Sequence, residues 1–424
     1  MKSLLTVFSL CLCFALFAQD EGLKYYDHIY LDNIKSVRFH LEDLLLSQPL
    51  YEINSGGRLR FSFDDIDGDV KDYVYTVVHC DRNWNPSDLT EMEYIDGFPE
   101  EMLDNYSFSF KTIGAFTHFE LMIPNRDMTL TKSGNYLLKV YEDEGEKRLA
   151  ITRRFMVVDS KVDIQARMVR PSQVSLSNTH QEIDFMVNYQ RFPMRSPQQE
   201  VRATILQNGR WDNAVVNLPP MFNRLDELSF DHQNKVVFPA GKEFRYLDLR
   251  SVYYPSENIY SIQAEEDIYE VALYKDQKRF NMAYLNREDI NGKFVIETLD
   301  QNNMDLSSNY ANVLFALYSP EPYFDYDVYL FGGLTDWRIQ NRFKMVYNNQ
   351  LNGYVGKVML KQGYYDYAYA VVPTDGSDRS ANMSEVEGDW FETENEYTIL
   401  IYYSPFGGRY DQLIGSVTIS SSKN

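Results

Sequence analysis

Apolar and polar side chains alternate in short runs along most of the chain. Leu59, Phe61 and Phe63 are separated by single polar residues, and Leu138 and Val140 repeat the same spacing. A period of two is typical of a β-strand that buries one face. Similar short runs, bounded by residues that favour turns, occur at 73–78, 149–158, 162–169, 181–189, 201–206, 268–274, 313–317, 328–331, 343–347, 355–360 and 397–402. No run with helical period is long enough to dominate, so the pattern predicts an all-β protein.

The length of the chain and the places where the pattern breaks predict its domains. A chain of 424 residues is too long for one ordinary domain and suits two or three. The run ending at Val158 closes a first set of strands, and the polar segment 300–309 is the best candidate for a later linker. We therefore predict three consecutive β-sandwich domains of immunoglobulin-like or early-set type, at 19–158, 159–299 and 300–424.

Tyr136 indicates the kind of sandwich in the first domain. Immunoglobulin-like sandwiches place a Tyr near the start of the sixth strand, two residues before the second cysteine of their disulfide. That cysteine position is Leu138 here. Cys80 is the one cysteine outside the N-terminal segment, so it has no intrachain partner, and we expect it to be a small buried apolar residue. The sequence predicts a sandwich stabilised by its core.

Residues 1–18 have the pattern of a secretory signal peptide. Lys2 precedes an almost wholly apolar stretch, and Ala18 suits the last residue before cleavage, which leaves Gln19 as the new terminus. No later stretch approaches the roughly 18–20 apolar residues that a membrane helix requires. The mature chain is therefore predicted to be exported, with no direct insertion into a membrane.

Charge and motifs argue against several classes of function. The net charge of −21 repels nucleic acid and anionic lipid, so nucleic acid is not an expected partner. None of the six histidines has the spacing of a zinc helix, and neither a nucleophile elbow nor a phosphate loop is present. The acidic run 64–69 resembles a calcium loop but lacks the distant Glu, which favours an ordinary acidic turn. We predict no catalytic residue, no cofactor and no metal site.

The most distinctive segment reads His79-Cys80-Asp81-Arg82-Asn83-Trp84 and is followed by Pro86-Ser87. It predicts a strand that runs into a structured turn, because Asp, Asn, Pro and Ser favour turns. A Trp in such a turn is costly to leave in water. Trp84 therefore either closes one end of a sandwich core or binds a partner.

The same segment carries a resemblance to a known family. Together with the blocks 133–140, 154–158, 207–212 and 242–250, it resembles the plug protein family of the type IX secretion system of Bacteroidota. Ala240-Gly241-Lys242 stands where the family often has Gly-Gly-Asn. The resemblance spans about residues 25–292. It implies a non-enzymatic periplasmic protein at the inner face of the outer membrane, which binds the outer-membrane translocon β-barrel and seals its pore from the periplasmic side.

The last third of the chain resembles the glycogen-binding early-set sandwiches in two blocks, 332–337 and 363–371. Trp337 matches the family's first sugar-stacking position. Ala368 replaces the Lys of the family's strand, and the second Trp is absent. The resemblance implies a shared fold with an incomplete sugar site, and the alternative function is a carbohydrate-binding periplasmic or surface protein. Trp84 and Trp337 are the candidate partner-binding residues.

Overall fold

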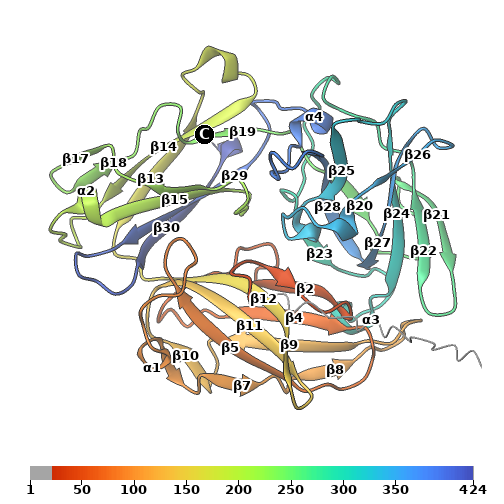
Figure 1. Cartoon of the computed structure of the whole chain (residues 1–424), viewed down its shortest axis with the longest axis horizontal. Coiled ribbons are helices and arrows are strands. Elements are labelled where there is room, and N and C mark those ends of the chain that lie inside the picture. Colours follow the sequence, from red (N-terminus) through yellow and green to blue (C-terminus); the bar gives the residue numbers. More distant parts are fainter. Residues whose placement is uncertain (1–21, 424) are drawn as a thin grey trace, which may run out of the picture.

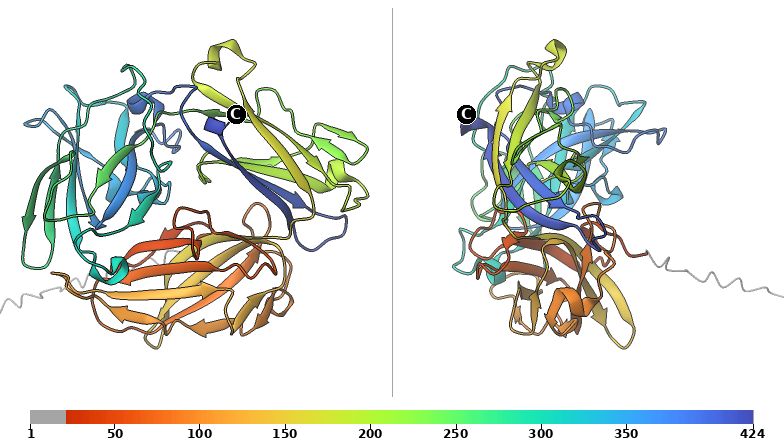
Figure 2. Two further views of the ribbon diagram at one scale, coloured as in Figure 1. Left: turned by 180° about the vertical axis from the view of Figure 1, so that it is seen from behind. Right: turned by 90° about the vertical axis from the view of Figure 1, so that its left-hand side faces the viewer.

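The computed structural model describes residues 22–423, so the predicted signal peptide lies outside the described residues. The described residues are nearly all β, which confirms the predicted fold class, and they form three β-sandwiches. The sandwiches lie side by side in a triangle, in a single layer that is thin when viewed edge-on (Figure 1 and Figure 2). Within the described range, no helix combines the length and the apolar character needed to cross a membrane.

The first sandwich contains strands β1 to β12. One sheet has the order β1-β12-β11-β5-β7, with β3 beside β12; a second has the order β2-β4-β9-β8; β6 and β10 form a two-stranded ribbon. The bounds are β1 His28–Ile29, β2 Ile34–Leu41, β3 Leu50–Glu52, β4 Leu59–Asp65, β5 Tyr73–Cys80, β6 Ile95–Gly97, β7 Glu100–Met102, β8 Tyr106–Phe108, β9 Thr117–Ile123, β10 Met128–Leu130, β11 Gly134–Asp143 and β12 Lys147–Val158, with the short helix α1 at Glu91–Tyr94.

Two predictions about the first sandwich are confirmed. The hydroxyl of Tyr136 donates a hydrogen bond to the carbonyl oxygen of Lys132 at 2.8 Å, which is the contact expected of a tyrosine corner. Leu138 is fully buried in the core, at the position where other sandwiches carry a cysteine. Cys80 is a buried free cysteine. Apolar packing therefore fills the place of a disulfide.

The second sandwich is built from two separate parts of the chain. Its sheets have the orders β13-β14-β18-β17, with β19 beside β14, and β16-β15-β29-β30. The bounds are β13 Asp163–Val169, β14 His180–Asn188, β15 Val201–Gln207, β16 Val215–Leu218, β17 Phe222–Arg224, β18 Glu227–Ser229, β19 Val237–Pro239, β29 Glu396–Tyr403 and β30 Gln412–Ser420. Three one-turn helices accompany them: η1 Val174–Leu176, α2 Pro197–Glu200 and η4 Ser421–Lys423.

The third sandwich lies between these two parts in the sequence. Its sheets have the orders β20-β28-β23, with β25 beside β28, and β21-β22-β24-β27-β26. The strands are β20 Arg245–Asp248, β21 Ile259–Ala264, β22 Tyr269–Leu273, β23 Phe294–Ile296, β24 Tyr310–Tyr318, β25 Tyr326–Phe331, β26 Val346–Asn348, β27 Gly353–Lys361 and β28 Gly363–Pro373. The short helices are α3 Met304–Ser307, η2 Gly333–Thr335, η3 Asn341–Phe343 and α4 Ser384–Glu387.

The strand pairing therefore differs from the predicted division at residue 299. The run at 397–402 is β29, which pairs with β15 and buries Tyr397, Ile399 and Ile401 in the core of the second sandwich. The run at 268–274 contains β22, which pairs with β24 of the third sandwich. Alternation shows that one face of a strand is buried, but it does not show which sheet the strand joins.

The polar segment 300–309 is also not a free linker. Asp300 accepts hydrogen bonds from Ser251 and Gln362, and Asn303 accepts two backbone N–H groups at the start of α3. Asp305 binds two arginines of the first sandwich. The polar side chains of this segment bind neighbouring loops and link the first sandwich to the third. A composition typical of a linker therefore occurs here at a junction between sandwiches.

Candidate functional site

The predicted site residue Trp84 lies at the junction between the first and second sandwiches. Its ring packs edge-on against Trp211, with 5.0 Å between centroids, and the guanidinium of Arg154 lies 4.3 Å from its centroid. Only 4% of Trp84 is exposed. The surrounding apolar cluster draws on both sandwiches: Cys80, Leu137, Met156 and Val158 from the first, and Leu206, Leu400, Tyr402 and Leu413 from the second. Trp84 therefore closes an interface within the chain, and a role in binding a partner stays a prediction.

The turn that carries Trp84 is built from the polar residues of the same motif. The Asp81 carboxylate accepts hydrogen bonds from the backbone N–H groups of Asn83 and Asn85, both at 2.8 Å. Arg82 donates from its backbone and its guanidinium to Asp411 of the second sandwich, at 2.8 and 3.0 Å. The motif that carries the family resemblance is thus a joint between sandwiches.

Trp337, the second predicted site residue, lies where all three sandwiches approach one another. Its ring packs edge-on against Phe244 and Phe331, and a Cβ at Gly292 would lie 2.3 Å from its Cη2. The guanidinium of Arg210, from the second sandwich, lies 4.9 Å from the ring centroid. The neighbouring Asp336 pairs with Arg153 of the first sandwich at 3.3 Å. This packing leaves Trp337 partly buried.

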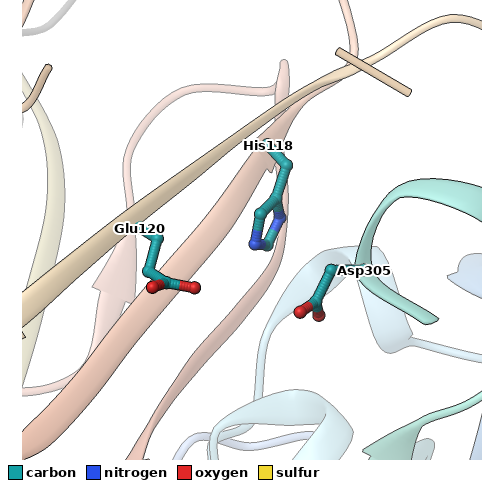
Figure 3. Close-up of side chains that lie close together, drawn as sticks. All are labelled: His118, Glu120 and Asp305. Carbon is teal, nitrogen blue, oxygen red and sulfur yellow. The ribbon is translucent and has the colours of Figure 1, made fainter. Parts of the chain in front are cut away.

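A charged network joins the first and third sandwiches. His118 and Glu120 project from β9, and Asp305 from α3 lies beside them (Figure 3). One ligand atom from each of these three lies within 4.8 Å of the others, which is close enough for a shared metal ion. Arg60, however, already pairs with both Glu120 and Asp305, and Arg38 binds Asp305 at 2.6 Å. The chain supplies its own cations here, so the cluster is better explained as an inter-sandwich ion network.

The centre of this network is Asp64, which is buried at the end of β4. It accepts hydrogen bonds from Lys361 and Tyr310 of the third sandwich, both at 2.6 Å, and contacts His118 Nδ1 at 2.6 Å. Burial alone would raise the pKa of Asp64, but Lys361 and His118 outweigh it and hold the pKa below its usual range. Asp64 is therefore a charged anchor between two sandwiches.

The carboxylates of the acidic run 64–69 are also paired with a cation from the chain itself. Asp65, Asp67 and Asp69 bring their carboxylates together. The ammonium of Lys71 pairs with all three, at 3.0 Å from Asp65 and 3.7 Å from Asp69. An intramolecular cation lies where the sequence resembled a calcium loop, which favours the acidic-turn interpretation.

A pair of acidic residues, which the sequence analysis did not single out, holds the loop that leads into β23. Asp366 accepts hydrogen bonds from the backbone N–H groups of Ile290 and Gly292, at 2.7 and 3.2 Å, and Asp289 accepts one from Phe244 at 2.6 Å. Burial raises the pKa of Asp366 to about 7, and the Asp289 carboxylate raises it further. Burial raises the pKa of Asp289 to about 6, and the carboxylates of Glu243 and Glu394 add to that rise. This loop borders a depression of about 750 Å³ that Leu44, Leu45 and Leu46 line from the first sandwich.

Comparisons with known proteins match this architecture. The model of the type 9 secretion system plug protein 1st domain matches residues 34–159, which contain strands β2 to β12 of the first sandwich. The crystal structure of a hypothetical protein from Parabacteroides merdae ATCC 43184, determined at 2.30 Å resolution, is 32% identical in sequence with a TM-score of 0.90. The alignment covers 94% of this chain and 100% of that chain, so the likeness includes all three sandwiches. No curated protein matches the chain.

Proposed function

This chain belongs to the type 9 secretion system plug protein family, and we propose that it is a non-enzymatic periplasmic plug. In this proposal it binds the outer-membrane translocon barrel from the periplasmic side and seals the pore when no cargo fills it. The observation that carries the proposal is the match of the plug model to strands β2 to β12 of the first sandwich, residues 34–159. The 32% identical structure, which is that of a hypothetical protein, shares the full three-lobed body.

The contacts between the sandwiches support the role of a rigid body that closes a pore. A pore wide enough for a folded protein admits small solutes unless a body of matching size closes it and keeps its shape. The cluster around Trp84 buries apolar side chains between the first and second sandwiches. The pair Lys361–Asp64 is buried between the first and the third. Separating the sandwiches would expose apolar surface and leave buried charges without partners, and both changes are costly.

The histidine of the family motif supports a role without catalysis. His79 Nδ1 contacts the Ser87 hydroxyl at 2.9 Å, and Nε2 contacts the carbonyl oxygen of Ser133 at 3.2 Å. Burial lowers the pKa of His79 to about 4. A buried, neutral imidazole with both nitrogens engaged is suited to holding a turn and poorly placed to exchange protons with a substrate.

Export of the chain is part of the proposal. Cleavage after Ala18 would release a periplasmic protein, and the periplasm is the compartment from which the inner mouth of an outer-membrane pore is reached. N-terminal sequencing of the mature protein from the periplasmic fraction should begin at or near Gln19. A cytoplasmic protein that keeps Met1 would contradict this compartment.

The direct test has two measurements. An affinity-tagged chain should co-purify the translocon from detergent-solubilised outer membranes. A strain that lacks the chain should keep the translocon assembled but admit a large hydrophilic antibiotic, and the full-length chain supplied in trans should restore the barrier. Secretion should suffer less than the barrier, because a stopper supplies no energy. If no translocon co-purifies and the deletion strain stays impermeable, the plug proposal is wrong.

A further inference from the structure

The first sandwich ends in two short edge strands, and the segment that follows β8 reaches the third sandwich, where the backbone N–H of Phe110 donates to the carbonyl oxygen of Leu306 in α3 at 2.8 Å. β7 ends one sheet and β8 ends the other, and both lie along the outer margin of that lobe (Figure 1). β8 pairs with β9 alone, so one side of its backbone has no neighbouring strand in the described part of the chain. An edge of this kind can accept an added strand through its unpaired N–H and C=O groups.

This margin is also unusually apolar for a surface. Five large apolar side chains between residues 98 and 110 are exposed, at Phe98 (60%), Met102 (56%), Tyr106 (41%), Phe108 (55%) and Phe110 (62%). The rings of Tyr106 and Phe108 pack edge-on against each other, with 5.9 Å between their centroids. Large exposed apolar patches on a soluble protein mark interaction sites.

The register of β8 explains why these rings are exposed. Tyr106 lies opposite Phe119 of β9, and the centroids of the two rings are 5.7 Å apart. Phe119 is fully buried in the core. Tyr106 and Phe108 therefore continue the core-facing side of the sheet beyond the point where the core covers it. A strand added beside β8 would extend the sheet and cover both rings.

The charge of the segment around β7 and β8 indicates what kind of partner this margin would bind. Residues 91–113 contain six acidic side chains, Glu91, Glu93, Asp96, Glu100, Glu101 and Asp104, and one basic side chain, Lys111. Glu93 and Glu100 are paired with Arg409 and Lys147 of the same chain, which leaves four acidic side chains against Lys111. This excess of negative charge disfavours anionic lipid and favours a basic protein segment. The exposed tyrosines of the third sandwich, such as Tyr254 and Tyr260, lie outside the part that the plug model matches.

We propose that the β7–β8 margin, residues 98–110, is the surface that docks on the translocon, by adding an extended, net basic segment of the translocon's periplasmic rim to β8. This inference rests on the proposed function. It specifies which face of the plug meets the barrel and what the barrel must present: an extended segment with apolar and basic side chains. The other two sandwiches then complete the width of the stopper.

The test compares three tagged variants with the wild-type chain in co-purification from detergent extracts. The edge variant Tyr106→Ser/Phe108→Ser should reduce the recovered translocon by about tenfold or more, since central aromatic contacts dominate interfaces. The control variant Tyr254→Ser/Tyr260→Ser removes two rings of the third sandwich that are more exposed, at 80% and 68%, and should leave recovery unchanged. The charge variant Asp96→Lys/Asp104→Lys should reduce recovery at low salt more than at high salt.

Thermal unfolding of each variant supplies the control for folding, because these side chains are exposed and their replacement should not change the midpoint by more than a few degrees. Equal recovery with the wild-type chain and the edge variant overturns the inference and leaves the plug function standing. Failure of the wild-type chain itself to recover the translocon overturns both.

A wild-type dimer in sedimentation that the edge variant turns into a monomer would assign the margin to a second copy. Flotation of the wild-type chain, but not the edge variant, with phosphatidylethanolamine–phosphatidylglycerol vesicles would assign it to lipid. Either result overturns the inference.

Discussion

Lys361 and Asp64 form an ion pair in which the ammonium nitrogen lies 2.6 Å from a carboxylate oxygen, and each side chain is only 1% exposed. The two residues are 297 positions apart, at the end of β27 in the third sandwich and of β4 in the first. Because both charges are removed from water, the pair is stable only while the two sandwiches keep this placement. This ion pair between residues far apart in the sequence therefore fixes the position of the first sandwich relative to the third.

Removing one partner of this ion pair should lower the stability of the folded chain. Lys361→Met leaves the Asp64 carboxylate buried without its cation, and we expect a loss of about 3–5 kcal/mol in the free energy of unfolding. The double variant Asp64→Asn/Lys361→Met removes both charges and should recover part of that loss. Urea denaturation of the wild-type chain, both single variants and the double variant gives the coupling energy.

A neighbouring surface pair is the matched control. Lys357 on the same strand pairs with Glu270 at 2.7 Å, and about half of the Lys357 side chain is exposed. Lys357→Met should cost no more than about 1 kcal/mol, because solvent screens the pair. Similar losses for Lys357→Met and Lys361→Met would show that the buried pair does not hold the sandwiches together.

The pair Asp366 and Asp289 should make stability depend on pH. In the folded chain, burial raises the pKa of Asp366 to about 7. In the unfolded chain the pKa of Asp is about 3.9. The folded state therefore holds the proton more tightly, and the free energy of unfolding should fall as the pH rises from about 4 through about 7. The loss should be on the order of 2 kcal/mol between pH 5 and pH 8.

Asp366→Asn removes this titration while keeping an oxygen that can accept from Ile290 and Gly292. Urea denaturation at pH 5 and pH 8 should show a smaller difference for this variant than for the wild-type chain. Asp43→Asn removes a carboxylate from an exposed loop position and serves as the control for the charge change. A pH difference that Asp366→Asn leaves unchanged would show that other groups produce it.

Trp84→Ala should destabilise the joint between the first and second sandwiches. Loss of a buried Trp costs about 3–5 kcal/mol, and the side chain also packs against Trp211 and Arg154. We expect a lower midpoint in thermal unfolding and faster proteolysis at the joint. Trp390→Ala, at a ring that is 41% exposed, should have a much smaller effect. Normal stability with lost translocon binding would instead identify Trp84 as a partner anchor.

The strands and the character of the first sandwich follow from local pattern, because burying one face imposes a period of two and a tyrosine corner requires Tyr136 near the start of its strand. The local pattern does not predict that β29 and β30 join the second sandwich, because any exposed sheet edge can accept an alternating strand. The ion network is equally invisible in the sequence, since Asp64 and Lys361 meet only through the folded arrangement of two sandwiches.

The candidate site shows the same limit. The sequence indicates that Trp84 and Trp337 are costly to expose, but it cannot distinguish a joint within the chain from a contact with a partner. Tyr106 and Phe108 alternate with serines, which is also the pattern of a strand with one buried face. Only the fold shows that no strand covers them, which is why the margin at β8 was missed.

The third sandwich should not bind glycogen-like glucans appreciably. Trp337 packs against Phe331 and Phe244, and the Arg210 guanidinium lies over its ring. Ala368, where the sugar-binding family has a Lys, is buried and offers no polar group. One stacked ring contributes on the order of 1–3 kcal/mol, by analogy with base stacking, which leaves affinity no better than millimolar. Calorimetry with malto-oligosaccharides should therefore show no saturable heat. Micromolar binding that Trp337→Ala abolishes would instead support the alternative function, a carbohydrate-binding protein.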